Sequence, residues 1–449
     1  MFPVEKIAQI VEGELLRGET ATPKRAIHDS RLVEPGDLFV ALPGQRSDGH
    51  TFLADAFDRG ASAAIVSETA ALPDHGRNLI RVPNPALALQ QWAAAWRQSL
   101  DATIVAITGT NGKTTVRALL GHFLSAHTSA YASPHNYNTE IGLPIALLSM
   151  PSDADIGVFE LGAERPGDIA LLASILQPHM GILTSVGPGH LDGFKTVSAV
   201  TAEKWSLIEH LPADGTAVVN ADVPRLPDLA ATVRVPIVTA GLENGDVRGH
   251  VLQTVPSLKV KLANQDITLC SPLVGAHNAA NLLLAAVAAN ALGISWKEIA
   301  DQAPSFEPIS HRLAPIQASF GILLDDTYNA NPASMSAALS VLASSSIEPV
   351  RRVFVFGEML GLGTASARFH RDIAQQALGL SIDAILPVGD AAIAACQAVG
   401  AGSEDTRIIV LPRHEIAGWI RSFSSPLVVL VKGSRDLKLE NLVDALQHL

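Results

Sequence analysis

The first stretch of the chain suited to chemistry is the turn TGTNGKTT at residues 108–115. It follows the apolar, β-branched run TIVAIT and precedes VRALLGHFL, a pattern that predicts a strand, a turn and a helix. Backbone N–H groups of a glycine-rich turn surround phosphate oxygens, and the helix adds its positive N-terminal end. We expect Lys113 to reach the β- and γ-phosphates of a nucleotide and the Thr114 hydroxyl to ligate Mg²⁺. The residues expected to cradle the phosphates are Gly109, Thr110, Asn111, Gly112, Lys113, Thr114 and Thr115.

This turn departs from the strict phosphate-loop pattern. The pattern G-x4-G-K-[ST] needs glycine at position 107, where this chain has Ile107, so the loop is a shortened variant. A glycine-rich turn that holds no ligand is the alternative. A lysine and two threonines follow the turn directly, which favours the phosphate-binding interpretation.

Three further side chains are suited to a phosphoryl-transfer site beside this turn. Glu160 ends the predicted strand IGVFEL, where it would face the same crevice, and a carboxylate there suits a hard cation such as Mg²⁺. His190 follows the predicted strand GILTSV, and Lys204 lies 14 residues further on, near the start of a helix. Taken alone, a strand-end glutamate is more often structural, and composition selects neither the histidine nor the lysine.

Two later stretches carry side chains suited to the sugar and base of a nucleotide. GAHNAANLLLAA places Asn281 at the opening of a predicted buried helix, where asparagine can also serve as an N-cap alone. DDTYNANPAS ends another predicted strand with Asp326, suited to a ribose hydroxyl, and Tyr328, suited to covering a base. The alternative for this second stretch is a turn followed by a helix that begins at proline.

The elements that must position these residues fall into three α/β segments. Residues 1–83 mix short helices and strands, and a proline-marked break follows them. Residues 84–310 alternate strands and helices, which predicts a mostly parallel sheet with functional groups at the C-terminal ends of its strands. Residues 311–449 predict a second, doubly wound domain, with strands at GILLDD, RVFVFGEM, DAILPVGD, RIIVL and PLVVLVKG.

Composition limits the class of function. The chain has 449 residues and a formal charge of −12, so we expect several domains and no binding to nucleic acid. The N-terminus lacks the apolar core of a signal peptide, and asparagines interrupt the most apolar stretch, AANLLLAAVAANALGI, so we expect no stable membrane insertion. Cys270 and Cys396 lack metal-ligand spacing, which favours a reduced, cytoplasmic compartment. We expect a monomer.

Together these stretches resemble the Mur ligase family, the ATP-dependent amide ligases of peptidoglycan precursor synthesis. TGTNGKTT is similar to the family's phosphate loop, HLDGF with Lys204 to its H-L-x-x-F…K element, and GAHNAAN to its G-x-H-N-x-x-N element. Six further stretches resemble the members that join D-Ala-D-Ala to UDP-MurNAc-tripeptide: HDSRLVEPGDLFVALPGQRSDGHTF, NYNTEIGLP, ELGAERPGDI, DDTYNANP, GEMLGLG and VKGSR. The resemblance implies a small α/β uridine-nucleotide-binding domain (1–83), a central P-loop ATPase domain with a mostly parallel sheet (84–310) and a C-terminal Rossmann-like ligase domain (311–449).

The resemblance also implies a mechanism and a role for each candidate residue. ATP would phosphorylate the peptide carboxylate, and the amine of D-Ala-D-Ala would attack the resulting acyl phosphate. The implied catalytic residues are Lys113, His190 and Lys204, and the implied Mg²⁺ ligands are Thr114, Glu160, His190 and Lys204, the last carbamoylated by CO₂. Besides the turn, the implied nucleotide-binding residues are Asn281, Arg312, Asp326 and Tyr328. Arg312 lies at a domain break, so we expect closure of the C-terminal domain to complete the site.

For the UDP-sugar-peptide and the dipeptide, the resemblance implies contacts by Ser30, Arg31, Asp48, His50, Asn136, Asn138, Glu140, Lys432 and Arg435. Other functions stay open at this point. One is a family ligase that adds the third peptide residue, although that ligase would have D-N-P-R where this chain has NANP. A second is a non-catalytic nucleotide-binding module. A third is a dinucleotide-dependent oxidoreductase, disfavoured because no G-x-G-x-x-G follows GILLDD.

Overall fold

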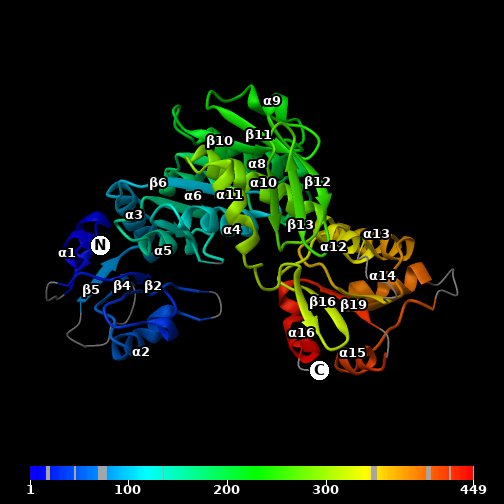
Figure 1. The fold of residues 1–449 in the computed structure, drawn as a ribbon. Helices are drawn as coiled ribbons and strands as arrows, with labels where there is room; N and C mark the ends of the chain where they lie inside the picture. Colours follow the sequence, from blue (N-terminus) through cyan, green and yellow to red (C-terminus); the bar gives the residue numbers. More distant parts are fainter. Residues whose placement is uncertain are drawn as a thin grey trace.

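The computed structural model describes residues 1–16, 21–44, 47–68, 78–134, 136–344, 351–400, 406–423 and 426–447. These residues form three separate β-sheets, each accompanied by helices. Figure 1 shows the sheet coloured cyan to green between an N-terminal body in blue and a C-terminal body in orange to red. The predicted α/β class, with three successive sheets, is confirmed.

The N-terminal sheet has the strand order β1-β5-β4-β3-β2, in which only β1 runs antiparallel to its neighbour. The predicted mixture of short helices and strands is present. The elements are α1 Val4–Ile10, β1 Glu14–Leu15, β2 Ala26–Ile27, β3 Leu38–Val40, α2 Leu53–Asp58, β4 Ala63–Ser67 and β5 Asn78–Val82.

The central sheet has the order β14-β13-β12-β11-β10-β9-β6-β8-β7 and is parallel from β7 to β12. Strands β12 to β14 extend it as an antiparallel meander, a feature that the sequence patterns above did not predict. The strands are β6 Thr103–Thr108, β7 Ala130–Ala132, β8 Ile156–Glu160, β9 Met180–Leu183, β10 Thr216–Asn220, β11 Ile237–Gly241, β12 Val247–Gln253, β13 Leu258–Leu262 and β14 Thr268–Ser271.

Helices cover both faces of the central sheet. They are α3 Pro85–Gln98, α4 Lys113–Ser125, α5 Gly142–Leu148, α6 Asp168–Leu176, α7 Leu191–Phe194, α8 Val197–Glu209, α9 Leu226–Ala230, α10 Ala276–Ala291 and α11 Trp296–Gln302. Helix α3 begins where the sequence predicts, because Pro85 occupies its first turn and the Asn84 side chain accepts hydrogen bonds from two backbone N–H groups. Helix α10 is the apolar stretch expected to be a buried helix, and most of its residues are buried.

The C-terminal sheet has the order β15-β16-β19-β17-β18 and is parallel except for β15. The predicted strand RIIVL is wrong: it makes a single bridge, Ile408 to Ile385, instead of a ladder. The elements are β15 Ala314–Ala318, β16 Gly321–Asp326, α12 Pro332–Ser344, β17 Arg351–Gly357, α13 Ser366–Gly379, β18 Ala384–Val388, α14 Asp390–Gly400, α15 Arg413–Arg421, β19 Leu427–Lys432 and α16 Glu440–Gln447.

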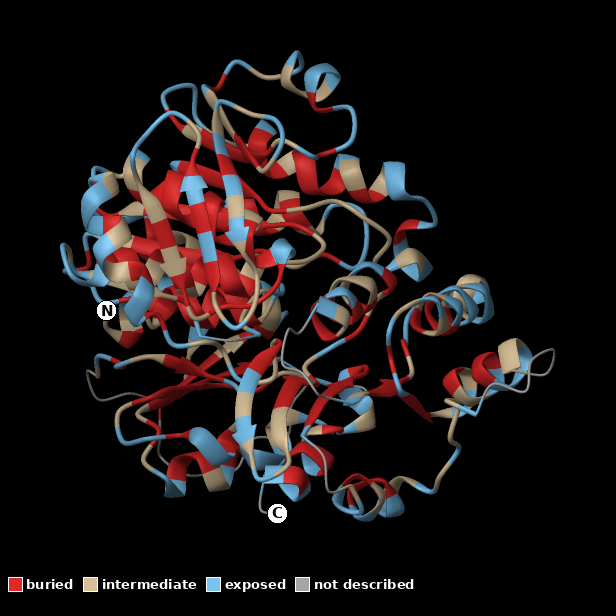
Figure 2. Ribbon diagram, turned by 45° about the vertical axis from the view of Figure 1, so that its right-hand side comes forward, coloured by how far each residue is buried: buried red, intermediate tan, exposed pale blue. Residues whose placement is uncertain are grey.

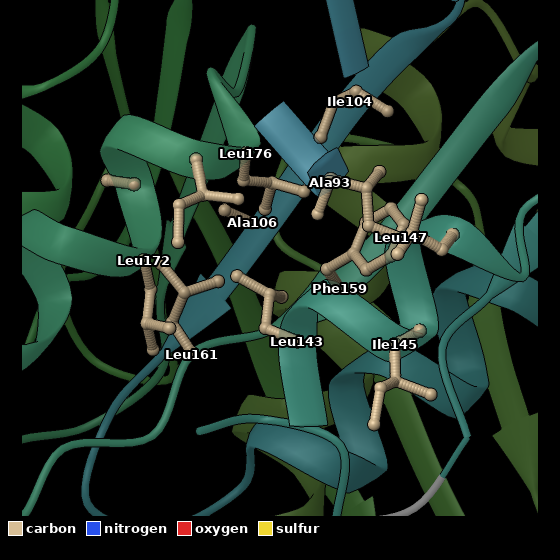
Figure 3. Close-up of a cluster of buried hydrophobic side chains, with 14 of the residues drawn as sticks. Ala93, Ile104, Ala106, Leu143, Ile145, Leu147, Phe159, Leu161, Leu172 and Leu176 are labelled. Atoms are coloured by element: carbon tan, nitrogen blue, oxygen red, sulfur yellow. The ribbon is translucent and has the colours of Figure 1, made fainter. Parts of the chain in front are cut away.

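Strand β6 shows how the central sheet is buried on both faces. Ile104 and Ala106 point into one core, whereas Val105 and Ile107 point into the core under α4 and α10. Figure 3 shows Ile104 and Ala106 among side chains from α3, α5, α6 and β8. The same core continues to Leu38 of the N-terminal sheet, and Figure 2 shows the buried strands enclosed by partly exposed helices. The first two bodies therefore share one hydrophobic core.

None of the described helices is both long enough and apolar enough to cross a membrane.

Candidate active site

Side chains from both the central and the C-terminal body line a cleft of about 1290 Å³. Register explains why the central side chains meet there. Ile107 of β6 pairs with Glu160 at the end of β8, and Thr108 pairs with Leu183 at the end of β9. Three neighbouring parallel strands therefore end at one edge, as the sequence predicts, and the loops that follow them line the cleft.

The phosphate loop has a backbone that only glycine permits at two positions. Gly109 and Gly112 have φ angles of 149° and 87°. A Cβ atom would lie 2.0 Å from the Thr184 hydroxyl at the first position and 2.3 Å from the Asn281 amide oxygen at the second. Gly112 is the N-cap of α4, so the N-terminal end of that helix opens into the cleft. This geometry fits a phosphate-binding turn.

Lys113 lies folded over its own loop. Its Nζ donates to the Gly109 carbonyl at 2.8 Å. Burial lowers the pKa of Lys113 to about 8, an effect opposed by Glu160 and reinforced by Arg312. The ammonium group therefore lacks a compensating carboxylate in direct contact within the described part of the chain, and an incoming polyphosphate would supply the missing negative charge.

Glu160 is buried and its two carboxylate oxygens have different partners. Arg117 Nε donates to Oε1 at 2.7 Å, and the Thr114 hydroxyl donates to Oε2 at 3.1 Å. Arg117 also donates from Nη1 to the Ser133 carbonyl at 2.5 Å, so the guanidinium bridges α4, β8 and the end of β7. Sequence reasoning missed Arg117. Its place four residues after Lys113, one helical turn along α4, was the available signal.

Lys204 and His190 form the other wall of the central part of the cleft. Lys204 is 3% exposed, and its ammonium group has no hydrogen bond or ion pair with any residue that the structure describes. Burial lowers the pKa of Lys204 to about 7, and the charge of Lys113 adds to that effect. Burial likewise lowers the pKa of His190, which sits at the left-handed N-cap position of α7. Both groups therefore lose their protons more easily than they would in water.

The C-terminal wall contains Arg312, Asp326 and Tyr328, as the sequence predicts. The Arg312 guanidinium carbon lies 3.9 Å from the centre of the Tyr328 ring. The Tyr328 hydroxyl donates to the Asn136 side chain of the central body. Asp326 is bound by Lys432, whose Nζ lies 2.7 Å from Oδ2. Burial lowers the pKa of Arg312, and neighbouring acids oppose the shift.

The remaining predicted residues of the cleft are Asn138, Glu140, Asn281 and Arg435, and all four line it. Asn281 is buried and donates to the Asn278 side chain at 3.0 Å, which fixes it against Gly112. Glu140 pairs with Arg165 at 3.3 Å, and Arg435 pairs with Glu440 at 3.5 Å. His277, which the sequence analysis did not assign, also lines the cleft, and burial lowers its pKa to about 4.

Ser30, Arg31, Asp48 and His50 lie in the N-terminal body and not along this cleft. Asp48 caps a short 3₁₀ helix by accepting from the His50 backbone N–H at 3.0 Å, and it also contacts the His50 ring at 2.6 Å. The other ring nitrogen accepts from the Ser67 backbone N–H at 2.9 Å. The two residues therefore hold the end of β4, and their expected contact with a uridine nucleotide stays a prediction.

The residues present fit one Mg²⁺ site better than two. The Thr114 and Glu160 oxygens are adjacent hard donors, the type that Mg²⁺ prefers. His190 and Lys204 offer nitrogen atoms, so they suit Mg²⁺ only if Lys204 carries a carboxylate such as a carbamate. No group of three or more His, Cys, Asp or Glu side chains suited to a metal is found among the described residues.

Comparisons with known proteins agree with this architecture. The Mur ligase middle domain model matches residues 107–289, the Mur ligase glutamate ligase domain model residues 311–435, and the Mur ligase family catalytic domain model residues 27–97. The UDP-N-acetylmuramoyl-tripeptide–D-alanyl-D-alanine ligase of Escherichia coli (strain K12) is 33% identical over 99% of this chain and 98% of its own length. The chain belongs to the Mur ligase family.

Other relatives extend the likeness. The Bacillus subtilis protein of the same name is 28% identical over 98% of this chain and 97% of its own length. The crystal structure of MurF from Acinetobacter baumannii has a TM-score of 0.89 at 29% identity, with complete coverage of both chains. That of the Thermotoga maritima MurF ligase in complex with ADP has a TM-score of 0.81 at 27% identity, covering 94% of this chain and 97% of the other. The family resemblance inferred from the motifs is thereby confirmed.

Proposed function

We propose that this Mur ligase joins D-Ala-D-Ala to the peptide carboxylate of UDP-MurNAc-tripeptide, with cleavage of ATP to ADP and phosphate. The observation that carries the proposal is the cleft itself. A glycine-rich loop, the partly buried Lys113, the buried Lys204 and a wall from the C-terminal body face one space, and neither lysine contacts a carboxylate of the described residues. Relatives named for this activity match nearly the whole chain, which supports the choice of substrates.

The chemistry explains why such a cleft is needed. A carboxylate is a poor electrophile, so the γ-phosphoryl group of ATP is transferred to it, and the amine then displaces phosphate from the acyl phosphate. Phosphoryl transfer depends mainly on placement and on charge neutralisation. Lys113 would neutralise the β- and γ-phosphates, and the two bodies around the cleft would keep water from the acyl phosphate.

We assign a Mg²⁺ ion to Thr114 and Glu160, because their oxygens are adjacent. Arg117 binds Oε1 of Glu160, so Oε2 faces the Thr114 hydroxyl. When bound, Mg²⁺ supplies charge neutralisation for the transferred phosphoryl group. A neutral lysine amine is the form that reacts with CO₂, and Lys204 is close to neutral at physiological pH. We therefore propose that Lys204 is carbamoylated and, with His190, completes a second Mg²⁺ site.

The other walls receive the rest of the substrates. Arg312, Asp326 and Tyr328 would bind the nucleotide, with Asn281 supporting the phosphate loop. Asn136, Asn138 and Glu140 would face the muramoyl peptide, and the N-terminal residues Ser30, Arg31, Asp48 and His50 would serve the uridine end. Arg435 stays the candidate for the dipeptide carboxylate. Lys432 has its ammonium bound by Asp326 and by the Asn329 carbonyl at 2.9 Å, so we assign it to support of the nucleotide-binding loop.

The test is an assay of the purified chain with UDP-MurNAc-tripeptide, ATP, Mg²⁺ and D-Ala-D-Ala. We expect phosphate release that depends on all four components, and a product whose mass equals that of the pentapeptide. The Lys113→Ala variant supplies the background and should release no phosphate above it. Phosphate release with diaminopimelate or lysine on the UDP-MurNAc-dipeptide, and none with D-Ala-D-Ala, would assign the chain to the third-residue ligases instead.

A further inference from the structure

Asn331 links the C-terminal body to the phosphate loop through one side chain. It immediately precedes α12, and its Oδ1 accepts from the Ser334 backbone N–H at 2.9 Å, which caps the helix. Its Nδ2 donates to Oδ1 of Asn111 at 2.7 Å. Asn111 lies in the loop between Gly109 and Lys113, so a residue 220 positions further along the chain contacts the phosphate loop directly.

The two amide side chains pair in both directions. Oδ1 of Asn331 accepts from the Ser334 N–H at 2.9 Å and from Nδ2 of Asn111 at 3.4 Å, while Nδ2 of Asn331 donates to Oδ1 of Asn111. The Asn111 main chain is held as well. Its N–H donates to the Ser185 hydroxyl at 3.0 Å, and its carbonyl accepts from the Thr184 hydroxyl at 2.5 Å. Because hydrogen bonds already hold the backbone of Asn111, a movement of α12 acts on the Asn111 side chain.

Within the described part of the chain, a second side-chain hydrogen bond crosses between the two bodies, from Tyr328 to Asn136. In addition, Gly363 lies so close to Asp192 that a Cβ atom would be 2.4 Å from its carboxylate oxygen. Of these residues, Tyr328 and Asn136 line the cleft. The contact made by Asn331 differs from these contacts because it ends on the phosphate loop itself.

We propose that Asn331 is a positioning residue, which couples docking of the C-terminal body to the nucleotide-binding geometry of the phosphate loop. The docked body orients Asn111, and a nucleotide that fixes Asn111 favours docking, because such coupling between two events is reciprocal. The proposal rests on the proposed function only in taking a nucleoside di- or triphosphate as the ligand of the loop. It does not depend on which amine the enzyme uses.

The test is a double-mutant cycle on the binding of ADP with Mg²⁺, measured by isothermal titration calorimetry. Asn331→Ser keeps a good N-cap but is too short to reach Asn111. We expect it to raise the Kd for ADP about 5- to 10-fold, the loss of one well-formed hydrogen bond in a partly buried site. In the background of Asn111→Ser, the same change should alter the Kd less than about twofold, because the partner is already missing.

Asn84→Ser is the matched control, since Asn84 caps α3 through its side chain and does not line the cleft. Its Kd for ADP should equal that of the parent. If Asn331→Ser does not fold, Asn111→Ser alone, which leaves the cap intact, must still weaken ADP binding at least threefold. An unchanged Kd in either variant, or independent effects that multiply in the double variant, would overturn the proposal. Loss of D-Ala-D-Ala ligation with an intact cycle would instead reject only the proposed function.

Discussion

Two buried lysines on opposite sides of the cleft have different surroundings. Lys204 of α8 is 3% exposed, has no ion-pair partner among the described residues, and has a pKa lowered to about 7. Lys432, at the end of β19, is 2% exposed, yet its ammonium lies 2.7 Å from Asp326 and 2.9 Å from the Asn329 carbonyl. Equal burial therefore produces one amine that loses its proton easily and one that is paired with a carboxylate.

The difference separates a reactive position from a structural one. A buried charge without a partner is expensive, and a protein retains it where chemistry needs it. A buried charge with a partner fixes the elements that carry the two groups. Lys432 ties β19 to Asp326 at the end of β16 and to the loop that follows, and so shapes the nucleotide wall. The amine of Lys204, with its lowered pKa, is the form that the proposed carbamoylation requires.

The comparison is tested most strongly by Lys204→Ala. If the amine carries the carbamate that completes a metal site, its loss should lower kcat by about 10²- to 10³-fold, the size of effect seen when one electrostatic stabiliser is removed. Added formate or acetate should restore part of the rate by occupying the vacated space. The control is Lys297→Ala, an exposed lysine on α11 that should leave the rate unchanged. Full activity of Lys204→Ala without additives would refute the carbamate.

The second test compares stability at the two positions. Lys432→Met leaves the partly buried Asp326 without its lysine partner and should lower the free energy of unfolding by about 2–3 kcal/mol. Lys204→Met removes an amine that has no ion-pair partner among the described residues, so it should be neutral or stabilising. Urea-unfolding midpoints followed by circular dichroism measure both. A loss of stability in Lys204→Met as large as that in Lys432→Met would show that Lys204 has a stabilising role that the structure does not reveal.

Local sequence patterns predicted the phosphate-loop side of the cleft much better than the surroundings of Lys432. The phosphate loop, Glu160 and His190 lie at or after the ends of strands within one alternating strand–helix segment, so that alternation sufficed to place them together. The partner of Lys432 lies 106 residues earlier in the chain, in Asp326, and no short-range pattern could reveal that the two meet. The sequence therefore suggested Lys432 as a functional residue, but it did not indicate that the Lys432 ammonium is paired with an acid.

Burial and long-range pairing account for the other gaps. Arg117 was missed because an arginine on a helix is ordinarily solvated, and its burial against Glu160 depends on the packing of α4 on the sheet. Strand β15 was missed because it is a short edge strand, antiparallel to β16. The antiparallel β12–β14 meander lay outside the alternation used to predict the parallel sheet. That Lys204 has no ion-pair partner among the described residues becomes evident only when the neighbouring side chains are placed.

A third test uses pH. The folded pKa of Lys204 is about 7 and the unfolded value about 10.4. The unfolded chain therefore binds more protons between these values, so the contribution of Lys204 to stability rises with pH and is lost as pH falls through about 7. In CO₂-free buffer, the difference in unfolding free energy between the parent and Lys204→Met should change by about 1 kcal/mol per pH unit between pH 8 and 9. A constant difference would mean that Lys204 keeps an ordinary pKa.

The smallest effect is expected at Arg117, a buried cation whose partner Glu160 belongs to the central wall. Arg117→Lys keeps the charge but cannot contact both the Glu160 carboxylate and the Ser133 carbonyl, because an ammonium lacks the planar fork of a guanidinium. We expect a loss of about 1 kcal/mol, roughly fivefold in kcat/KM, and a higher Mg²⁺ concentration for half-maximal rate. Arg225→Lys, at an exposed pair with Asp228, is the control. If Arg117→Lys matched the parent in both measurements, charge alone would suffice at this position. A buried basic side chain would then need an acidic partner, but the geometry of the pair would not matter.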